Sequence, residues 1–190
     1  MDRIIDFFLD EPEKEFHVRQ IAKLVEKSPT TVSKYLKKLE KENFLISEKK
    51  LNHLFFKANS ENNKFKIIKL NYNLNGLFNS DVIDYLVKEF NYPEAIVLFG
   101  SFAKAENVPK SDIDLLIITS LKKEIELKKF EKKLGHKIQL FIYSKKEIEK
   151  MKNKDLLNNF INGIVVYGFL EVFKWNSKIL LKKEMQKNHL

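Results

Sequence analysis

The sequence predicts an α+β protein built from two parts. In residues 1–42, apolar side chains recur every three or four positions, which is typical of amphipathic helices. After residue 94 the apolar residues instead form short continuous runs, which are typical of buried strands. Only 5 glycines and 4 prolines are present, so each of them is a useful marker of a break between elements.

The first part is expected to contain three helices and a hairpin. Helical spacing places the helices at about 2–9, 18–25 and 29–42, and β-type runs place two strands at 44–49 and 54–58. Ser28-Pro29 has the form of an N-cap followed by proline at the first helical position, so the third helix is expected to begin there. Leu51-Asn52-His53 is expected to form the turn between the strands.

The second part is expected to contain a mixed β-sheet flanked by helices. A linker helix is predicted over 62–74, ended by Asn75-Gly76, and Ser80 is expected to cap the helix that follows at 81–90. The predicted strands lie at 95–99, 112–119, 137–143, 163–167 and 169–173. The other predicted helices lie at 122–134, 145–151 and 155–162, with Ser144 and Asp155 as caps of the last two.

These elements divide the chain into four segments. They are a first domain over 1–58, a linker helix over 59–75, a second domain over 76–175 and a polar, Lys-rich tail over 176–190. The hydrophobic share of 44%, with 16 Phe, is high enough to build real cores and excludes a disordered chain. Trp175 is expected to pack over an exposed apolar edge.

Composition also bounds the location and the chemistry of the protein. Cysteine is absent, which excludes disulfides, thiolate metal sites and a cysteine nucleophile. No apolar run approaches the ~20 residues of a membrane span, and the first residues lack the basic-then-apolar layout of a signal peptide. We therefore expect a cytoplasmic protein that does not bind a membrane.

The net charge of +9, from 35 basic and 26 acidic residues, is a weak indication of a polyanionic partner such as nucleic acid. The excess is uneven along the chain. Residues 94–190 hold 19 basic and 12 acidic residues, whereas residues 1–60 hold 12 and 10. Nucleic-acid binding by the first domain would therefore depend on a local basic patch.

Two stretches of the first domain resemble winged helix-turn-helix regulators. Residues 16–23 are similar to the second helix of that fold, and Ser28–Glu42 is similar to its recognition helix. Hydroxyl side chains near a helix N-terminus reach base edges, and lysines farther along meet phosphates. The resemblance therefore implies DNA contacts from Thr30, Thr31, Ser33, Lys34, Lys37 and Lys38, and from Lys49, Lys50, Asn52 and His53 in the wing. A protein-docking or homodimerisation role for the same fold is the alternative.

The second domain contains Gly100-Ser101 at the end of a predicted strand and Asp112-x-Asp114 at the start of the next. Residues i and i+2 of a strand share a face, so the two carboxylates are expected to lie about 7 Å apart along the strand and to converge on a divalent cation. Glycine allows close backbone approach to a phosphate, and serine offers hydrogen-bond donors. These residues suit the binding of a metal–triphosphate complex.

The same motif resembles the minimal nucleotidyltransferases of the DNA polymerase β-like superfamily. The resemblance implies a nucleoside triphosphate, with ATP favoured, bound by Gly100, Ser101, Lys104 and Ser111. It implies Mg²⁺ or Mn²⁺ held by Asp112 and Asp114, which are also the expected catalytic residues. A hydroxyl of a protein or small molecule would then attack the α-phosphate as pyrophosphate leaves.

The chain departs from this family at two places. The third carboxylate of the family falls on the strand after the next helix, where this sequence has Gln139, which carries no charge and cannot act as a base. Glu94 and Glu131 are the substitutes that the sequence offers. Ala105 stands where the family often has glycine, and we expect that alanine cannot replace glycine if a positive φ is needed there.

Residues 162–168 are similar to the closing strand of archaeal proteins that fuse a winged helix to this domain, which extends the resemblance to the whole chain. The related enzymes of toxin–antitoxin pairs imply, by analogy, a tyrosine of a HEPN-type partner protein as acceptor. Two alternatives to an active enzyme remain. One is a nucleotide-responsive, DNA-binding transcriptional regulator with weak or no catalysis, and the other is a structural adaptor with both sites silent.

Overall fold

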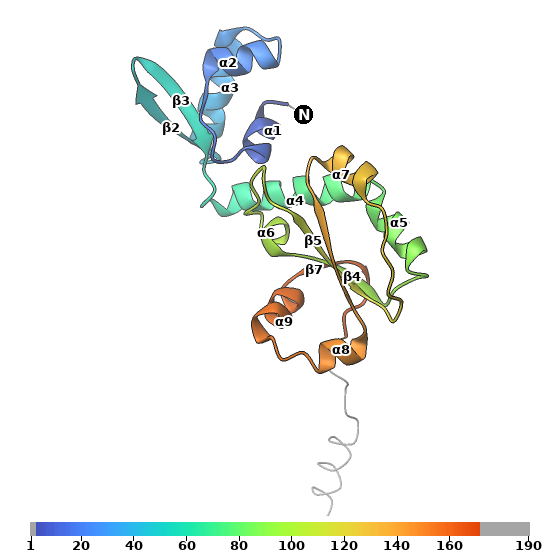
Figure 1. Ribbon diagram of the computed structural model, residues 1–190. Coiled ribbons are helices and arrows are strands. Elements are labelled where there is room, and N and C mark those ends of the chain that lie inside the picture. Colours follow the sequence, from blue (N-terminus) through green and yellow to red (C-terminus); the bar gives the residue numbers. More distant parts are fainter. Residues whose placement is uncertain (1–2, 172–190) are drawn as a thin grey trace, which may run out of the picture.

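The computed structural model describes residues 3–171, with the side chain of Arg3 excepted, as two modules joined by one long helix (Figure 1). The expected tail over 176–190 and Trp175 lie outside the described residues. No helix in the described range is long and apolar enough to cross a membrane. The modules have separate apolar cores, so each is described in turn.

The first module is a winged helix-turn-helix, as the sequence predicts. Its helices are α1 (Arg3–Asp10), α2 (Val18–Leu24) and α3 (Pro29–Lys41), and its strands are β1 (Phe16–His17), β2 (Leu45–Lys50) and β3 (His53–Ala58). The strands form an antiparallel sheet in the order β1-β3-β2. Ser28 caps α3 by accepting the Thr31 N–H at 3.2 Å, and Pro29 occupies the first turn, which confirms the predicted start of this helix.

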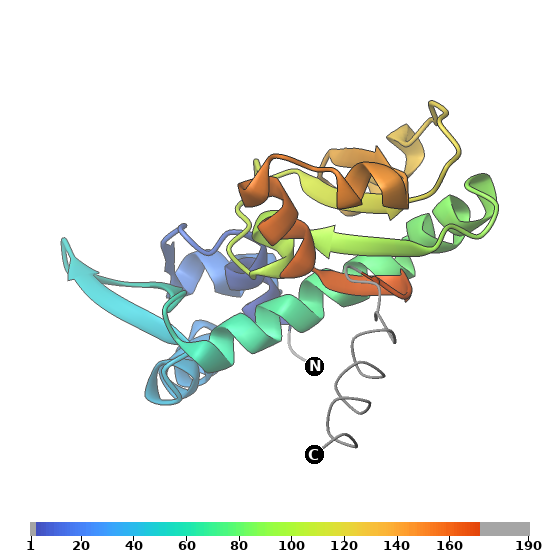
Figure 2. The same ribbon diagram turned by 90° about the horizontal axis from the view of Figure 1, so that it is seen from below.

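The hairpin β2–β3 projects from the module as the wing (Figure 2). Leu51 and Asn52 connect the two strands, and both have positive φ, at 45° and 63°. Two consecutive positive φ values characterise the type I′ turn, whose twist matches that of paired strands. The turn thus presents Asn52 and His53 at the tip of the wing.

The linker helix α4 (Asn63–Asn79) is longer than predicted. The predicted end at Asn75-Gly76 is wrong, because Leu77 remains buried in the core of the second module and extends the helix by another turn. The Ser80 N–H bonds the Gly76 and Leu77 carbonyls and closes α4. Ser80 Oγ also accepts the Val82 N–H at 3.3 Å, so Ser80 does support the start of the next helix, α5 (Val82–Glu89).

One stripe of α4 connects the two modules. The buried residues of this helix lie at four-residue intervals, namely Phe65, Lys69, Asn73 and Leu77. Phe65 belongs to the core of the first module and Leu77 to that of the second. Between them, Lys69 Nζ donates to the Leu9 carbonyl of α1 at 2.6 Å, and Tyr72 OH donates to Asp10 at 2.8 Å. The polar part of the stripe therefore attaches α4 to the last turn of α1, where carbonyls lack helical partners.

Gly76 lies inside α4, and a Cβ built on it would be 4.0 Å from its nearest neighbour, a Leu134 methyl. Helix interiors disfavour glycine relative to alanine by about 0.5–1 kcal/mol. Gly76→Ala is therefore expected to raise the free energy of unfolding by about that amount, as measured by urea denaturation. A lower stability would show that the methyl does not fit against Leu134.

The second module contains a four-stranded mixed sheet, which confirms the predicted fold class. Its strands are β4 (Ala95–Phe99), β5 (Ile113–Ile118), β6 (Ile138–Tyr143) and β7 (Ile164–Gly168), in the order β6-β5-β4-β7. β5 and β6 are parallel, and the other pairs are antiparallel. The end of α4, α5 and α7 (Lys128–Leu134) cover one face, and α8 (Lys145–Glu149) and α9 (Lys154–Ile161) cover the other.

Three predicted elements of this module differ from the structure. The helix predicted over 122–134 begins only at Lys128, because Lys122 donates to the Ile142 carbonyl and Lys123 pairs with Glu89, which holds residues 121–127 across the sheet edge. The described part of the strand predicted at 169–173 is not a strand, since Gly168 takes a φ of 71° and turns the chain. Asn153, rather than Asp155, caps α9.

Candidate functional site

Asp112 and Asp114 lie at the beginning of β5, next to the end of β4. Asp114 is opposite Phe99, the last residue of β4, and Asp112 directly precedes β5 in the loop. The alternation of β5 sends Ile113 to the face that carries α4, α5 and α7, and Asp114 to the opposite face. Asp112 is exposed and Asp114 is half-buried.

Gly100 is in direct contact with Asp114. Gly100 has a φ of 71°, and a Cβ built on it would overlap Asp114 Oδ2 and lie 3.3 Å from Asp114 Cγ. The absence of a side chain at residue 100 therefore makes room for the carboxylate as well as permitting the left-handed backbone. This contact brings the Gly-Ser turn and the aspartate pair into one site, although twelve residues of chain lie between Gly100 and Ile113.

Aromatic side chains pack beside the site. The Phe99 ring lies 5.1 Å from Phe141 and 4.9 Å from Phe160, and all three belong to the core between the sheet, α8 and α9. Burial beside these groups raises the pKa of Asp114, and the charge of Asp112 raises it further. Two carboxylates that repel each other in this way favour the binding of a cation between them.

Gln139 of β6 lies beside Asp114. The parallel register pairs Asp114 with Gln139, so the two side chains share one face of the sheet. The position predicted for the third carboxylate is therefore adjacent to the aspartates and holds an exposed, uncharged amide. An amide oxygen can ligate a cation but does not neutralise its charge.

The substitutes considered for the missing acid do not join the site. Glu94 precedes the opposite end of β4, about 17 Å from Phe99 at about 3.4 Å per strand residue, and lies 3.9 Å from Lys145. Glu131 accepts the Ile138 N–H at 3.0 Å from α7, on the other face of the sheet. Within residues 3–171, no group of three or more acidic or histidine side chains could hold a metal.

The other residues predicted to bind the nucleotide surround the site unequally. Ser101 lies in the one-turn helix α6 (Gly100–Ala103), directly after Gly100, and Lys104 is exposed at its end. Ser111 is engaged locally, because its Oγ accepts the Val108 N–H at 2.9 Å and its carbonyl accepts from His136 Nδ1 at 2.8 Å. Its position secures the loop that leads into Asp112.

Ala105 has a φ of 57°, so the position does require the left-handed backbone and alanine adopts it. The expectation that alanine cannot take the place of glycine here is wrong, since Ala105 is buried and its neighbours hold it. The Ala105 N–H bonds to Phe102, and the Glu106 N–H to Ser101 at 2.9 Å, which closes the turn after α6.

The residues present fit a small divalent cation. Mg²⁺ is commonly held by one or two carboxylates, with phosphate oxygens and water in its other positions. Asp112 and Asp114 provide two carboxylates on an open side of the module, and Gln139 provides an amide oxygen beside them. The arrangement suits a metal that arrives with a triphosphate better than one held by protein alone.

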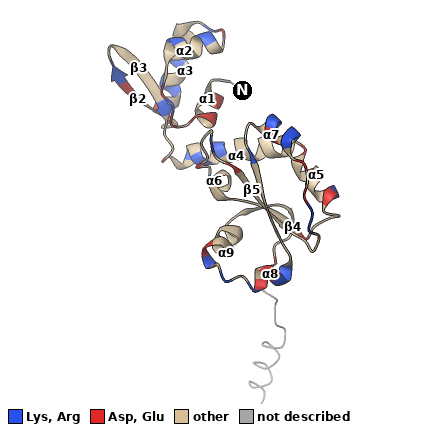
Figure 3. Cartoon of the chain, in the orientation of Figure 1, with Lys and Arg blue, Asp and Glu red and all other residues tan. Residues whose placement is uncertain are grey.

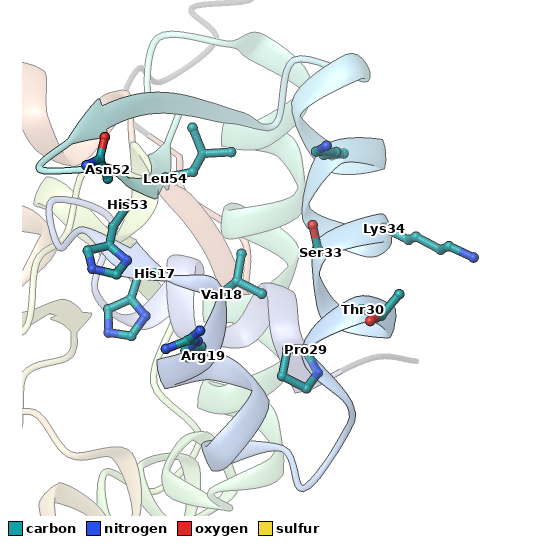
Figure 4. A pocket seen from close by; sticks show the side chains of 11 residues that line it. His17, Val18, Arg19, Pro29, Thr30, Ser33, Lys34, Asn52, His53 and Leu54 are labelled. Atoms are coloured by element: carbon teal, nitrogen blue, oxygen red, sulfur yellow. The ribbon is translucent and has the colours of Figure 1, made fainter.

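A groove of about 560 Å³ separates α3 from the wing in the first module (Figure 4). Six residues predicted to contact DNA line it, namely Thr30, Ser33, Lys34 and Lys37 of α3 and Asn52 and His53 of the wing. None of its lining residues is acidic. Figure 3 shows basic residues along α2, α3 and the wing, and Arg19, Lys34 and Lys37 are the ones that line the groove.

The remaining predicted DNA contacts lie outside this groove. Thr31 shares a hydrogen bond with Ser28 at the start of α3, and Lys38 lies 4.0 Å from Glu42. Lys49 is exposed on β2. Lys50 is paired with Glu15 at 2.6 Å and Glu48 at 3.1 Å, and its bonds with these carboxylates raise its pKa. Both acidic partners of Lys50 therefore belong to the first module.

Arg19 and His17 line the groove but were not predicted as nucleic-acid contacts. Arg19 lies in the first turn of α2, facing the start of α3 (Figure 4). The rarity of arginine could have indicated Arg19 as a contact residue, because the chain has only two arginines beside 33 lysines. His17 caps α2 by accepting the Gln20 N–H at 3.3 Å, so this histidine also has a structural role at the start of the helix.

Comparisons with known families agree with this division of the chain. Residues 80–162 match the model of the nucleotidyltransferase domain, and residues 3–47 match the model described as bacterial regulatory protein, arsR family. No curated protein matches the chain. The two matched segments fall on the two modules, on either side of α4.

Proposed function

We propose that this protein, in which a helix-turn-helix domain precedes a nucleotidyltransferase domain, moves a nucleoside monophosphate from a triphosphate, most simply ATP, to a hydroxyl group. The observation that carries the proposal is the contact between Gly100 and Asp114, which unites the phosphate-binding turn with the carboxylate pair. Asp112 and Asp114 are proposed to hold Mg²⁺ or Mn²⁺. When bound, the cation neutralises charge on the phosphates and polarises the α-phosphate.

The residues of the chain position the reacting groups. Gly100 and Ser101 receive the β- and γ-phosphates through backbone and hydroxyl donors, and Lys104 balances their charge. The acceptor oxygen forms a bond to the α-phosphorus while the bond to the pyrophosphate oxygen breaks in line. Gln139 cannot take the acceptor proton, so that proton leaves to solvent. This route predicts slow transfer in the natural protein.

A second candidate is a DNA-binding regulator that responds to a nucleotide without significant turnover. The uncharged Gln139 beside Asp114 favours it, because the family's third carboxylate helps to hold the metal that activates the nucleophile.

For the enzyme, a HEPN-type partner protein is proposed as one source of the acceptor hydroxyl, by analogy with related enzymes. Under either candidate the chain binds a metal–triphosphate complex.

Incubation with each NTP labelled at the α-phosphate separates the candidates. Binding is measured by equilibrium dialysis, and transfer by retention of label on protein or on added small-molecule hydroxyls. Label transfer that needs Mg²⁺ or Mn²⁺ supports the enzyme. Metal-dependent binding without transfer, both alone and with a HEPN-type protein, supports the regulator. Absence of binding to every NTP contradicts both.

The carboxylate pair is expected to control metal-dependent nucleotide binding. Asp112→Asn combined with Asp114→Asn should abolish the increase in NTP affinity that Mg²⁺ or Mn²⁺ produces, because no other acidic group within residues 3–171 joins the site. Isothermal titration calorimetry with and without metal measures the difference. Glu106→Gln, which removes an exposed carboxylate from the same loop, is the matched control and should keep the metal effect. Equal metal dependence in the double variant would refute the assignment.

The groove between α3 and the wing is proposed to bind duplex DNA. Thr30 and Ser33 lie near the start of α3, where side chains reach base edges, and Lys34, Lys37 and Arg19 offer positive charge to phosphates. The lack of acidic residues in the lining leaves these charges unopposed within the groove.

Lys34→Ala and Lys37→Ala are each expected to weaken DNA binding and to reduce the slope of log K against log[salt] by about 0.9, the value for one lost phosphate contact. Fluorescence anisotropy at several salt concentrations measures the slope. Lys64→Ala removes the same charge from an exposed position at the start of α4, outside the groove, and should change the slope less. Unchanged slopes in both groove variants would favour the protein-docking role instead.

A further inference from the structure

A second cavity, of about 370 Å³, lies at the junction of the two modules. Its walls come from the end of α1, from α4, from β4 and β5, from α6 and the loop after it, from the end of α7 and from His136. The polar members of this lining include Asp10, Tyr72, Asn73, Asn107 and His136, and Gly76 of α4 also lines it. Its volume is within the range of small-molecule sites, which is roughly 300–1,000 Å³.

Two buried amides line this cavity with incomplete hydrogen bonding. Asn73 is 7% exposed, and its Nδ2 donates to the Phe102 carbonyl at 3.0 Å and to Asn107 Oδ1 at 2.8 Å. These bonds use both hydrogens of Asn73 and fix the orientation of Asn107, which is 4% exposed. Asn73 Oδ1 and Asn107 Nδ2 have no partner within residues 3–171, and neither is sealed from solvent. The cavity lining therefore includes one acceptor and one donor that have no partner among the described residues.

The remaining lining determines what kind of ligand fits. Leu77, Leu98, Phe102, Ile113 and Leu134 provide an apolar interior, and Tyr72 and His136 provide flat walls. At the rim, the Asp10 carboxylate accepts from the uncharged Tyr72 hydroxyl, and Lys133 lies 3.1 Å from Asp81. The carboxylate disfavours a phosphate and the lysine already has an acidic partner, which together favour an uncharged ligand.

We propose that this cavity binds an uncharged nucleobase or nucleoside through the paired amides Asn73 and Asn107. A base has a flat apolar face and an edge on which a hydrogen-bond donor and an acceptor are neighbours, which complements Asn73 Oδ1 and Asn107 Nδ2. The ligand would contact α1, α4 and α6 together, and so both modules.

This site is separate from the metal–triphosphate site. Ile113 lines the cavity, whereas its neighbour Asp114 points to the opposite face of β5. Phe102 lines the cavity, whereas Gly100, two residues earlier in α6, does not. His136 lines both this cavity and the separate hollow that contains Asp112. The inference does not depend on the proposed transfer reaction.

The test uses the full chain without divalent metal and four probes, adenosine, guanosine, cytidine and uridine, with Kd measured by calorimetry or saturation-transfer NMR. At least one nucleoside is expected to bind. Asn107→Asp keeps the acceptor for Asn73 but replaces the donor that faces the cavity, and should raise Kd at least about tenfold, the effect of one lost hydrogen bond. Gly76→Leu, which places a side chain against Leu134 at the cavity wall, should raise Kd by at least as much.

Two controls make the result specific. Gly76→Ala adds only a Cβ and should bind like the natural protein, and Asp114→Asn should leave nucleoside binding unchanged because its side chain lies on the other face. Circular dichroism verifies that each variant is folded. If Asn107→Asp unfolds, the Kd of Gly76→Leu alone tests the proposal. The proposal is overturned if no nucleoside binds at millimolar concentration. It is equally overturned if binding survives both cavity variants or is lost in Asp114→Asn.

Discussion

Gly100→Ala is expected to reduce metal-dependent NTP binding, and any transfer, by at least about 100-fold. The added Cβ would occupy the position of Asp114 Oδ2, so the carboxylate must move by about an ångström or more or the turn must open. A misplacement of about 1 Å in a catalytic arrangement commonly costs on the order of 10²-fold in rate. Calorimetry measures the binding, and label transfer measures the reaction.

Gly135→Ala is the matched control for this change. Gly135 has a φ of 73°, nearly that of Gly100, but a Cβ built on it meets no atom within 4 Å. Both substitutions therefore impose the same backbone strain, about 1–2 kcal/mol, and only Gly100→Ala also displaces Asp114. If the two variants lose stability equally and both keep NTP binding, the contact between Gly100 and Asp114 has no functional role.

Gln139→Asp or Gln139→Glu is expected to raise nucleotide transfer above that of the natural protein, by about tenfold or more. Gln139 lies in register with Asp114, so a carboxylate there would complete a set of three on one face of the sheet. A metal that holds the nucleophile stabilises the transition state by several kcal/mol, and each 1.36 kcal/mol is about tenfold in rate. Partial recovery is therefore measurable in single-turnover experiments with labelled NTP.

Gln139→Asn controls for side-chain length, because asparagine has the shape of aspartate without its charge. It should not increase transfer. If the natural protein is already fast and Gln139→Asp slows it, the third position has been misassigned. If Gln139→Asp tightens metal binding but produces no transfer, the regulator is favoured over the enzyme.

The first module and the strands around the candidate site were predictable from the sequence for local reasons. Ser28 and Pro29 are residue types that favour the start of a helix wherever they occur together. Residues 95–99 and 113–118 form mostly apolar runs, and the sheet buries them completely or nearly so. The Gly-Ser and Asp-x-Asp pairs were found because residue type and spacing describe the chemistry of a metal–triphosphate complex. Neither inference needed to know which residues meet across the fold.

The errors arose where partners distant in the chain decide the local structure. Asn75-Gly76 has the composition of a helix end, yet Leu77 is buried beyond it and α4 continues. Asp155 has the composition of a helix cap, but Asn153 caps α9 in the folded module by accepting the Leu156 N–H. Residues 122–127 have helical spacing, but Lys122 and Lys123 bond to β6 and α5, and these residues form no helix.

Local sequence was sufficient for the identity of most elements and of the carboxylate pair, because backbone preferences and side-chain chemistry act over a few residues. The strand register places Gln139 beside Asp114, where the family resemblance expected the third carboxylate. The folded chain alone decided that Gly100 touches Asp114 and that Glu94 and Glu131 do not join the site. It also decided that Asn73 and Asn107 meet at the junction of the modules. These relations depend on strand register and on the packing of α4 against both cores, which arise from contacts between residues far apart in the chain.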